Sequence, residues 1–335
     1  MNWKTLIGLI ISAAFLFLAF RKVDPGELKS ALESADYIYL LPIVLLVGVS
    51  MILRVFRWRY LLRPVKDIPF GSIFYATAIG LMANNVLPAR LGELIRAYVI
   101  GRRENISKSA SFATVIVARI FDGLTILSFL AAVFVFYAFS LPGWLRKAAI
   151  ITLAIYLMAI LVLVLLKIRT EAVLRAASFI LRPFPDRMGA RILQVLDSFA
   201  GGLKILHSTR EILYSAVLSI FIWVPNIVII HLLLLSFGIH LPFFASMVLL
   251  VAIVIGVTIP SAPGYIGTIQ YATVAGLALF GVPKSLALSF SLVYHAGVFI
   301  PATIAGIICL PAAGFSFREL RTSVESPDAD FGKNG

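Results

Sequence analysis

The chain has 335 residues, of which 61% are hydrophobic and only 13% are charged, whereas a soluble domain is typically about half apolar and a quarter charged. This composition excludes an ordinary soluble domain. Because apolar runs of about 20 residues recur without strand-like alternation, it indicates an α-helical integral membrane protein. The net charge of +13 is explained by Lys and Arg in cytoplasmic loops and near anionic headgroups, so no nucleic-acid partner is expected.

The predicted fold class is an all-α polytopic membrane protein with about six full spans and two re-entrant helical hairpins arranged as an inverted repeat. The first apolar segment lacks an obvious small-residue cleavage site, so it is interpreted as an uncleaved span. The polar segment 21–36 has Leu28 and Leu32 on one helical face and is expected at the interface. The full spans are predicted at residues 5–20, 37–53, 109–140, 148–166, 212–237 and 286–312.

The segment 54–66 sets the predicted orientation. It carries five positive charges, from Arg54, Arg57, Arg59, Arg63 and Lys66, and is predicted to be a cytoplasmic loop. We therefore expect a multi-pass protein of the cell (cytoplasmic or inner) membrane with cytoplasmic N- and C-termini.

Residues 70–100 are predicted to form the first re-entrant hairpin. Basic segments flank it on both sides, so it should enter and leave the bilayer on the same side. Its second arm, residues 89–100, would be only about 18 Å long as a helix, which is too short to cross the membrane. Pro88 and Gly92 are placed near its tip.

The two halves of the sequence repeat the same order: a span, an amphipathic segment, a span, a broken apolar run and a long span. Pro263, Gly264 and Gly267 form the second break. An odd number of spans separates equivalent points, which predicts opposite orientations, as in many secondary transporters. We therefore predict one transmembrane domain at 1–314, with repeats at 1–140 and 141–314, a cytoplasmic amphipathic segment at 167–210 and a disordered cytoplasmic tail at 315–335.

Five charged residues lie where charge is expensive: Arg90, Glu93 and Arg96 on one helical face, and Arg119 and Asp122 within a long span. If exposed to lipid, they would cost about 12–17 kcal/mol, so they must face one another, water or a ligand. One alternative is internal pairing of Arg90 with Glu93 and of Arg119 with Asp122, with Arg96 extended to the interface. The other is capture of a lipid phosphate by Arg90, Arg96 and Arg119.

Uncharged polar residues could extend this site into a polar path. Tyr265 is equally explained as an interfacial anchor, and His295 is either a core hydrogen-bonding residue or a polar gate. No group of His, Cys, Asp and Glu suggests a metal site, so no cofactor is expected. The candidates are Asn84, Asn85, Tyr265, Gln270 and His295.

Three motifs resemble one known family. They are NNVLPARLGELIRAYVI at 84–100, SASFATVIVARIFDGL at 109–124 and TIPSAPGYIGTIQYAT at 258–273. They are similar to the transmembrane region of lysylphosphatidylglycerol synthase, a family of flippase-like membrane proteins that occurs alone, fused to an aminoacyl-transferase domain, or beside glycosyltransferases acting on polyprenyl phosphates. The resemblance implies lipid translocation, with Arg90, Glu93, Arg96, Arg119 and Asp122 at the characteristic polar positions.

The leading hypothesis is therefore a lipid flippase or transporter that moves a phosphate-containing headgroup through a polar groove. A membrane-embedded transferase acting on a polyprenyl phosphate or phospholipid, and a scaffold for a separate lipid-modifying enzyme, remain alternatives. The expected partner is a phospholipid or polyprenyl-phosphate lipid, and the oligomeric state stays open. An enzyme is the less favoured hypothesis, because nothing in the sequence resembles a nucleotide-sugar or metal site. No ATP-binding motif is present either, so active pumping would need an ion gradient.

Overall fold

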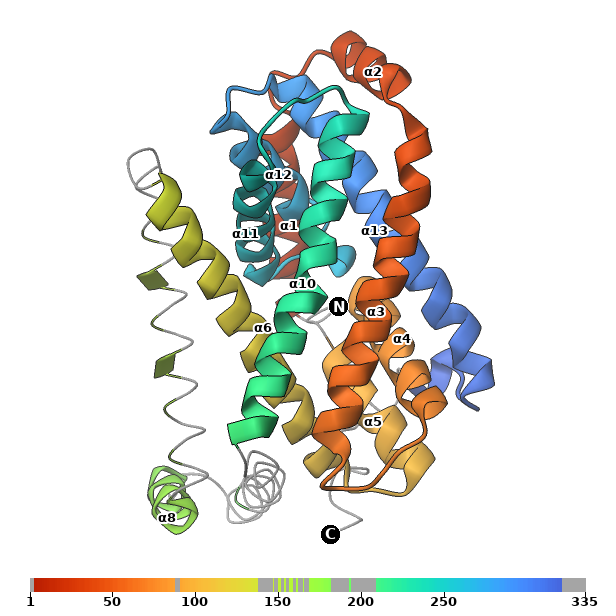
Figure 1. Cartoon of the computed structure of the whole chain (residues 1–335), viewed down its shortest axis with the longest axis vertical. Helices are drawn as coiled ribbons and strands as arrows, with labels where there is room; N and C mark the ends of the chain where they lie inside the picture. The colour runs from red at the N-terminus through yellow and green to blue at the C-terminus, as the bar shows by residue number, and fades with distance from the viewer. Residues whose placement is uncertain are drawn as a thin grey trace.

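The computed structural model describes residues 3–87, 91–137, 169–181 and 209–320, with a few single positions between 138 and 208. The predicted span at 148–166, most of the segment 182–208, the tail from 321, and Pro88 and Arg90 lie outside these residues. The elements within them are all helices (Figure 1). In chain order they are α1 (Trp3–Phe20), α2 (Pro25–Ser34), η1 (Tyr37–Tyr39), α3 (Leu40–Leu62), α4 (Phe70–Val86), α5 (Gly92–Glu104), α6 (Lys108–Tyr137), α8 (Thr170–Ile180), α10 (Thr209–Ser236), α11 (Phe243–Thr258), η3 (Pro263–Tyr265), α12 (Thr268–Ala278) and α13 (Lys284–Ala312).

The all-α membrane architecture is confirmed. In the described part of the chain, four helices are long and apolar enough to cross a membrane, at Tyr37–Leu62, Lys108–Val133, Leu213–Ser236 and Lys284–Ala312. A fifth crossing is possible at α1 and α2, which meet at 85°. The α1 helix begins about midway along the long axis of the molecule (Figure 1). The total of six spans and the cytoplasmic N-terminus stay predictions.

Both predicted hairpins are present as pairs of packed helices, α4 with α5 and α11 with α12. Close approach in the first pair depends on Gly92, because a Cβ there would overlap the Gly80 carbonyl oxygen. The second pair turns through η3 and the residues after it. Gly264 in η3 and Gly267 just before α12 have φ of 74° and 94°, backbone conformations that favour glycine. The chain therefore reverses where the breaks are predicted, while re-entry into the bilayer stays a prediction.

The helices pack in matched pairs across the two halves. In the first half α5 packs on α6 and α3 on α4, and in the second half α12 packs on α13 and α10 on α11. Contacts between the halves match as well, since α4 lies against α13 and α11 against α6, while α3 packs on α10. The two hairpins occupy opposite ends of the molecule (Figure 1). This arrangement supports the predicted inverted repeat.

The apolar core forms two clusters, one for each hairpin. The first surrounds α4 and α5 and includes the fully buried Trp58 and Met82, and the second lies among α10, α11 and α13 and includes Leu249 and Phe290. The candidate site lies where helices from both halves meet, between these clusters.

The second span is longer than predicted. The α3 helix continues to Leu62, so Arg54, Arg57 and Arg59 are helical residues and not part of a loop. The side chain of Arg57 is only 2% exposed. The loop prediction was wrong because the charge rule treats each arginine as solvated, whereas Arg57 has a buried acidic partner.

Residues 315–320, which the sequence assigns to a disordered tail, pack against the rest of the molecule. Phe315 and Leu320 are buried in the first core cluster, and Arg102 donates a hydrogen bond to the Glu319 carboxylate over 2.8 Å. The expectation of disorder from residue 315 was therefore wrong for 315–320, because this short stretch has apolar side chains that pack against α5.

Candidate functional site

A cavity of about 480 Å³ lies between the two halves. Helices α4, α5 and α6 of the first half contribute to its wall, as do α10, α11 and α13 of the second half. The α11 wall is apolar, with Ile253, Val254 and Val257. The opposite wall is charged, with Glu93 and Asp122. An apolar cavity with a few convergent polar groups has the general character of a ligand site.

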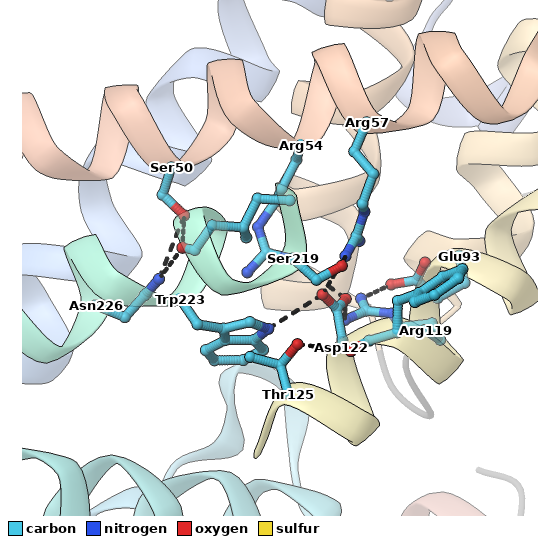
Figure 2. A network of polar contacts seen from close by, with 12 residues as sticks. Ser50, Arg54, Arg57, Glu93, Arg119, Asp122, Thr125, Ser219, Trp223 and Asn226 are labelled. Atoms are coloured by element: carbon cyan, nitrogen blue, oxygen red, sulfur yellow. Dashed lines mark hydrogen bonds and ion pairs between the residues drawn. The ribbon is translucent and has the colours of Figure 1, made fainter. Parts of the chain in front are cut away.

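Asp122 is the centre of the charged wall (Figure 2). Its carboxylate accepts hydrogen bonds from Arg57 at 2.7 Å, from Arg54 at 3.5 Å and from the Trp223 indole N–H at 3.1 Å. The Arg119 guanidinium lies 3.6 Å from the same carboxylate. Three guanidinium groups and one indole N–H thus surround a single buried carboxylate, which compensates its charge.

Glu93 forms the second acidic position of this wall. It pairs with Arg119, so Arg119 is shared between Glu93 and Asp122 (Figure 2). Asn84 holds Glu93 in place: its side-chain N–H donates to Glu93 Oε1 over 3.0 Å, and its oxygen accepts the Gly92 backbone N–H over 2.9 Å. The start of α5 is thus fixed to the end of α4 by one amide side chain.

Helix α10 completes the network from the second half. Arg57 donates to the Ser219 hydroxyl over 2.7 Å, and the Arg54 guanidinium lies over the Trp223 ring at 5.3 Å, within cation–π range. Asn226 donates to the Ser50 hydroxyl over 3.3 Å. The site is therefore built across the α3–α10 contact and cannot form within one half alone.

A neutral polar pair joins α12 to α13: His295 lines the cavity, and Gln270 is buried behind it. Gly267 N–H donates to Gln270 Oε1 over 2.7 Å, so the Gln270 amide nitrogen is the atom that lies 3.0 Å from His295 Nδ1. The Gln270 amide therefore donates to Nδ1, which leaves the proton on Nε2 for a hydrogen bond to the Gly264 backbone. This arrangement favours a neutral His295.

Arg96 lies behind the charged wall, near enough for its charge to act on Arg54, Arg57 and Asp122. It is buried and stacks on the Trp58 ring at 3.7 Å, and it is not part of the cavity wall. The alternative in which Arg96 extends to the interface is therefore wrong, because α3 covers the side chain and supplies an aromatic face for its charge.

The structure brings most of the predicted residues together. Those that line the cavity are Asn85, Glu93, Arg119, Asp122, Tyr265 and His295. Asn84 and Gln270 support them through the hydrogen bonds described above, whereas Asn85 donates away from the cavity centre, to the Thr303 hydroxyl over 2.9 Å. The predicted Arg119–Asp122 pair exists, but Arg57 is the nearer partner of Asp122.

Arg54, Arg57 and Trp223 are functional candidates that sequence reasoning missed. One signal for the arginines was available, because no helix breaker separates them from the preceding apolar run before Pro64. Their spacing of three residues also places both on one helical face. Within the described ranges, no group of three His, Cys, Asp or Glu residues could hold a metal ion.

Comparison with known proteins gives one family over nearly the whole chain. The family described as the lysylphosphatidylglycerol synthase TM region matches residues 5–306. A UPF0104 membrane protein of Methanothermobacter thermautotrophicus is 26% identical, over 93% of this chain and 95% of the relative. UPF0104 membrane protein MJ1595 of Methanocaldococcus jannaschii is 26% identical, over 92% and 94% respectively. Glycosyltransferase AglD of Haloferax volcanii is 28% identical over 86% of this chain and 51% of AglD.

Proposed function

Because the chain belongs to the lysylphosphatidylglycerol synthase TM region family, we propose that it moves a phosphate-containing lipid headgroup across the cytoplasmic membrane. The cavity between the two halves is the proposed headgroup site. The end of the molecule that carries Lys66, Arg102 and Arg103 faces the cytoplasm in this proposal, as basic loop regions generally do.

The exposure of Arg119 is the observation that carries this proposal. Its side chain is 41% exposed and lines the cavity, whereas that of Arg57 is 2% exposed. Guanidinium groups bind phosphate oxygens through paired, charge-assisted hydrogen bonds. Of the three arginines around Asp122, Arg119 is thus the most accessible to a headgroup, while Arg57 and Arg54 hold the carboxylate.

The network allows Arg119 to exchange partners. When Arg119 turns toward a phosphate, Asp122 keeps the hydrogen bonds from Arg57 and Trp223, and Glu93 keeps the one from Asn84. Neither carboxylate is left without a donor, so the exchange avoids the cost of an uncompensated buried charge. Glu93 and Asp122 then compete with the phosphate for Arg119, which favours release as well as binding.

The apolar wall fits the other part of a lipid. Ile253, Val254 and Val257 of α11 face the cavity together with Val298 and Phe299 of α13. An acyl or polyprenyl chain bound there keeps its apolar surface away from water while its phosphate lies at Arg119.

The test is a flip assay with purified protein in liposomes. A fluorescent phospholipid on the inner leaflet becomes accessible to a membrane-impermeant quencher only after translocation. Arg119→Gln should lose most of this translocation and keep its thermal unfolding temperature close to that of the wild type. Arg59→Gln is the matched control, since Arg59 lies on α3 and pairs with the exposed Asp67. Wild-type translocation by Arg119→Gln would contradict the proposed role.

A second candidate is a transferase, or the membrane partner of one. It is favoured by the similarity to about half of a protein named glycosyltransferase AglD. Glu93 is the available acid or base, because one of its carboxylate oxygens, Oε2, is buried without a hydrogen bond. Formation of a glycolipid by the purified chain with a labelled sugar donor, lost in Glu93→Gln, would establish this candidate.

A further inference from the structure

We propose that the charged site selects phosphates with two negative charges, meaning phosphate monoesters or diphosphates, over singly charged phosphodiesters and zwitterionic headgroups. This inference rests on the proposed function, because it specifies the headgroup that the cavity would bind. It follows from the balance of charge around Asp122.

The described charged side chains around Asp122 are four arginines and two carboxylates, which leaves a surplus of two positive charges. Helix α3 supplies Arg54 and Arg57, α6 supplies Arg119, and α5 supplies Arg96 close by on the Trp58 ring. Only two carboxylates face these four arginines among the described residues of the site, those of Glu93 and Asp122. His295 of α13 does not add to the surplus, because its Nδ1 accepts a hydrogen bond from Gln270.

A surplus of two charges in a buried site needs a matching anion. The side chains of Arg57 and Asp122 are 2% and 7% exposed, so water shields them poorly and each unmatched charge is costly. A phosphate monoester carries about −1.5 to −2 charges at pH 7, which closely matches the surplus. A phosphodiester carries only one negative charge and leaves part of the surplus unbalanced.

Unused hydrogen-bond donors indicate the same preference. Arg57 Nε, Arg96 Nε and one terminal nitrogen of Arg96 are buried without a hydrogen-bond acceptor. Buried donors normally have partners, and the one described acceptor of the network that also lacks a partner, Glu93 Oε2, does not match three such donors. A monoester phosphate presents three strong acceptor oxygens, and a diester presents two unesterified ones. Movement of the shared Arg119 toward such a group would leave Asp122 more available to the neighbouring arginines.

A positively charged headgroup is disfavoured by the same count. An aminoacylated or choline headgroup would bring an ammonium beside four arginines that already outnumber their two carboxylates. At about 4 Å, repulsion between two like charges is several times stronger in a partly buried site than in bulk water.

The experiment is a competition for the purified protein between phosphatidic acid, phosphatidylglycerol and phosphatidylcholine with identical acyl chains. Retained lipids are counted by native mass spectrometry. We expect phosphatidic acid to be retained over phosphatidylglycerol by about tenfold, which corresponds to about 1.4 kcal/mol, and phosphatidylcholine to be retained least. Inorganic phosphate in a parallel arm should not displace phosphatidic acid, because it cannot use the apolar wall.

Charge variants make the preference testable from both sides. Arg54→Gln removes one surplus charge and should bring the ratio of phosphatidic acid to phosphatidylglycerol close to one. Glu93→Gln adds one and should raise the ratio, and it decides the question if Arg54→Gln does not fold. Arg59→Gln, an exposed change on the same helix, should leave the ratio unchanged.

The outcomes separate this preference from the proposed function. Equal retention of phosphatidic acid and phosphatidylglycerol, both lost in Arg119→Gln, would overturn the preference and leave the phosphate site in place. Lipid retention that Arg119→Gln does not change would overturn both. Displacement by inorganic phosphate would overturn a lipid as the source of the phosphate.

Discussion

The two halves of the molecule share one arrangement but carry different chemistry. In each half a polar link joins the return helix of the hairpin to the long helix that follows it. The link is Glu93–Arg119 between α5 and α6, and Gln270–His295 between α12 and α13. The first link is charged and connected to Asp122, Arg54 and Arg57, whereas the second is neutral.

This difference concerns how easily the residues of each link can change partners. In the second half, the hydrogen bonds from Gly267 through Gln270 to His295 have matched donors and acceptors, so nothing there favours exchange. In the first half, Arg119 has two competing carboxylates, and in the proposed function a phosphate takes their place. The two halves therefore have similar helices, but the first half carries ion pairs with competing partners and the second half carries neutral hydrogen bonds without competing partners.

The substitution with the largest expected effect on this comparison is Asp122→Asn. It removes the shared partner of the arginines while keeping the side chain's volume. We expect a loss of about 3–5 kcal/mol in the free energy of unfolding, because Arg57 stays buried with its charge uncompensated. Chemical denaturation in detergent measures this loss. Asp67→Asn, which breaks an exposed pair with Arg59, should cost less than about 1 kcal/mol. Equal effects would show that Asp122 is not the centre of the network.

The two hairpin glycines form the next comparison. Gly267→Ala forces a side chain into a φ of 94° and against the Ser12 carbonyl oxygen, and such backbone strain costs about 1–3 kcal/mol. Gly92→Ala has no positive φ but pushes α5 away from Gly80 and Asn84. We expect Gly267→Ala to lower mainly the unfolding temperature and Gly92→Ala to lower translocation as well. Normal translocation by Gly92→Ala at reduced stability would contradict this division.

A smaller effect is expected at the neutral link. Gln270→Ala removes the acceptor for Gly267 N–H and the donor for His295, and an unsatisfied buried group costs about 1–3 kcal/mol. Translocation per folded molecule should stay close to that of the wild type, because the proposed phosphate ligand is Arg119 and Gln270 does not contact it. Loss of translocation comparable to that of Arg119→Gln would show that the neutral link also takes part in binding.

The smallest effect concerns the chain after α13. The hydrogen bond from Arg102 lowers the pKa of Glu319 below its usual value of 4.5. Because the folded pKa is lowered, this contribution to ordering is present at neutral pH and is lost as pH falls from about 4.5 through the lowered value. Once exchange rates are corrected for their intrinsic dependence on pH, the hydrogen-exchange protection of residues 315–320 should fall in that acidic range. In Arg102→Gln the same protection should be lower already at pH 7. Protection that changes neither with pH nor with this substitution would show that the Arg102–Glu319 hydrogen bond does not order residues 315–320.

The sequence predicts the features that depend on local pattern. The all-α membrane fold class and the family are confirmed by the helices and by the match at residues 5–306, and the chain reverses at both predicted breaks. Glu93, Arg119 and Asp122 could be selected because charge within apolar segments is rare and must be paired. Each of these signals lies within a short stretch of sequence.

The features that were missed depend on contacts between distant residues. Arg57 meets Asp122 across 65 positions and Ser219 across 162, so no local pattern separates it from a loop arginine. Arg96 lies on the same helix as Glu93, but its guanidinium stacks on Trp58 of α3 and does not line the cavity. The burial of Phe315 and Leu320 requires the neighbouring α5, which a polar tail composition does not reveal.

The contact between α1 and the second hairpin has a consequence for the order of synthesis. Ser12 accepts a hydrogen bond from the Ala262 backbone N–H, a contact that spans 250 positions. At about 5–20 residues per second, the ribosome needs roughly 12–50 s to make the chain between them. During that time α1 has no η3 turn to pack against, so a transient partner such as the insertion machinery or lipid must occupy its hairpin-facing side.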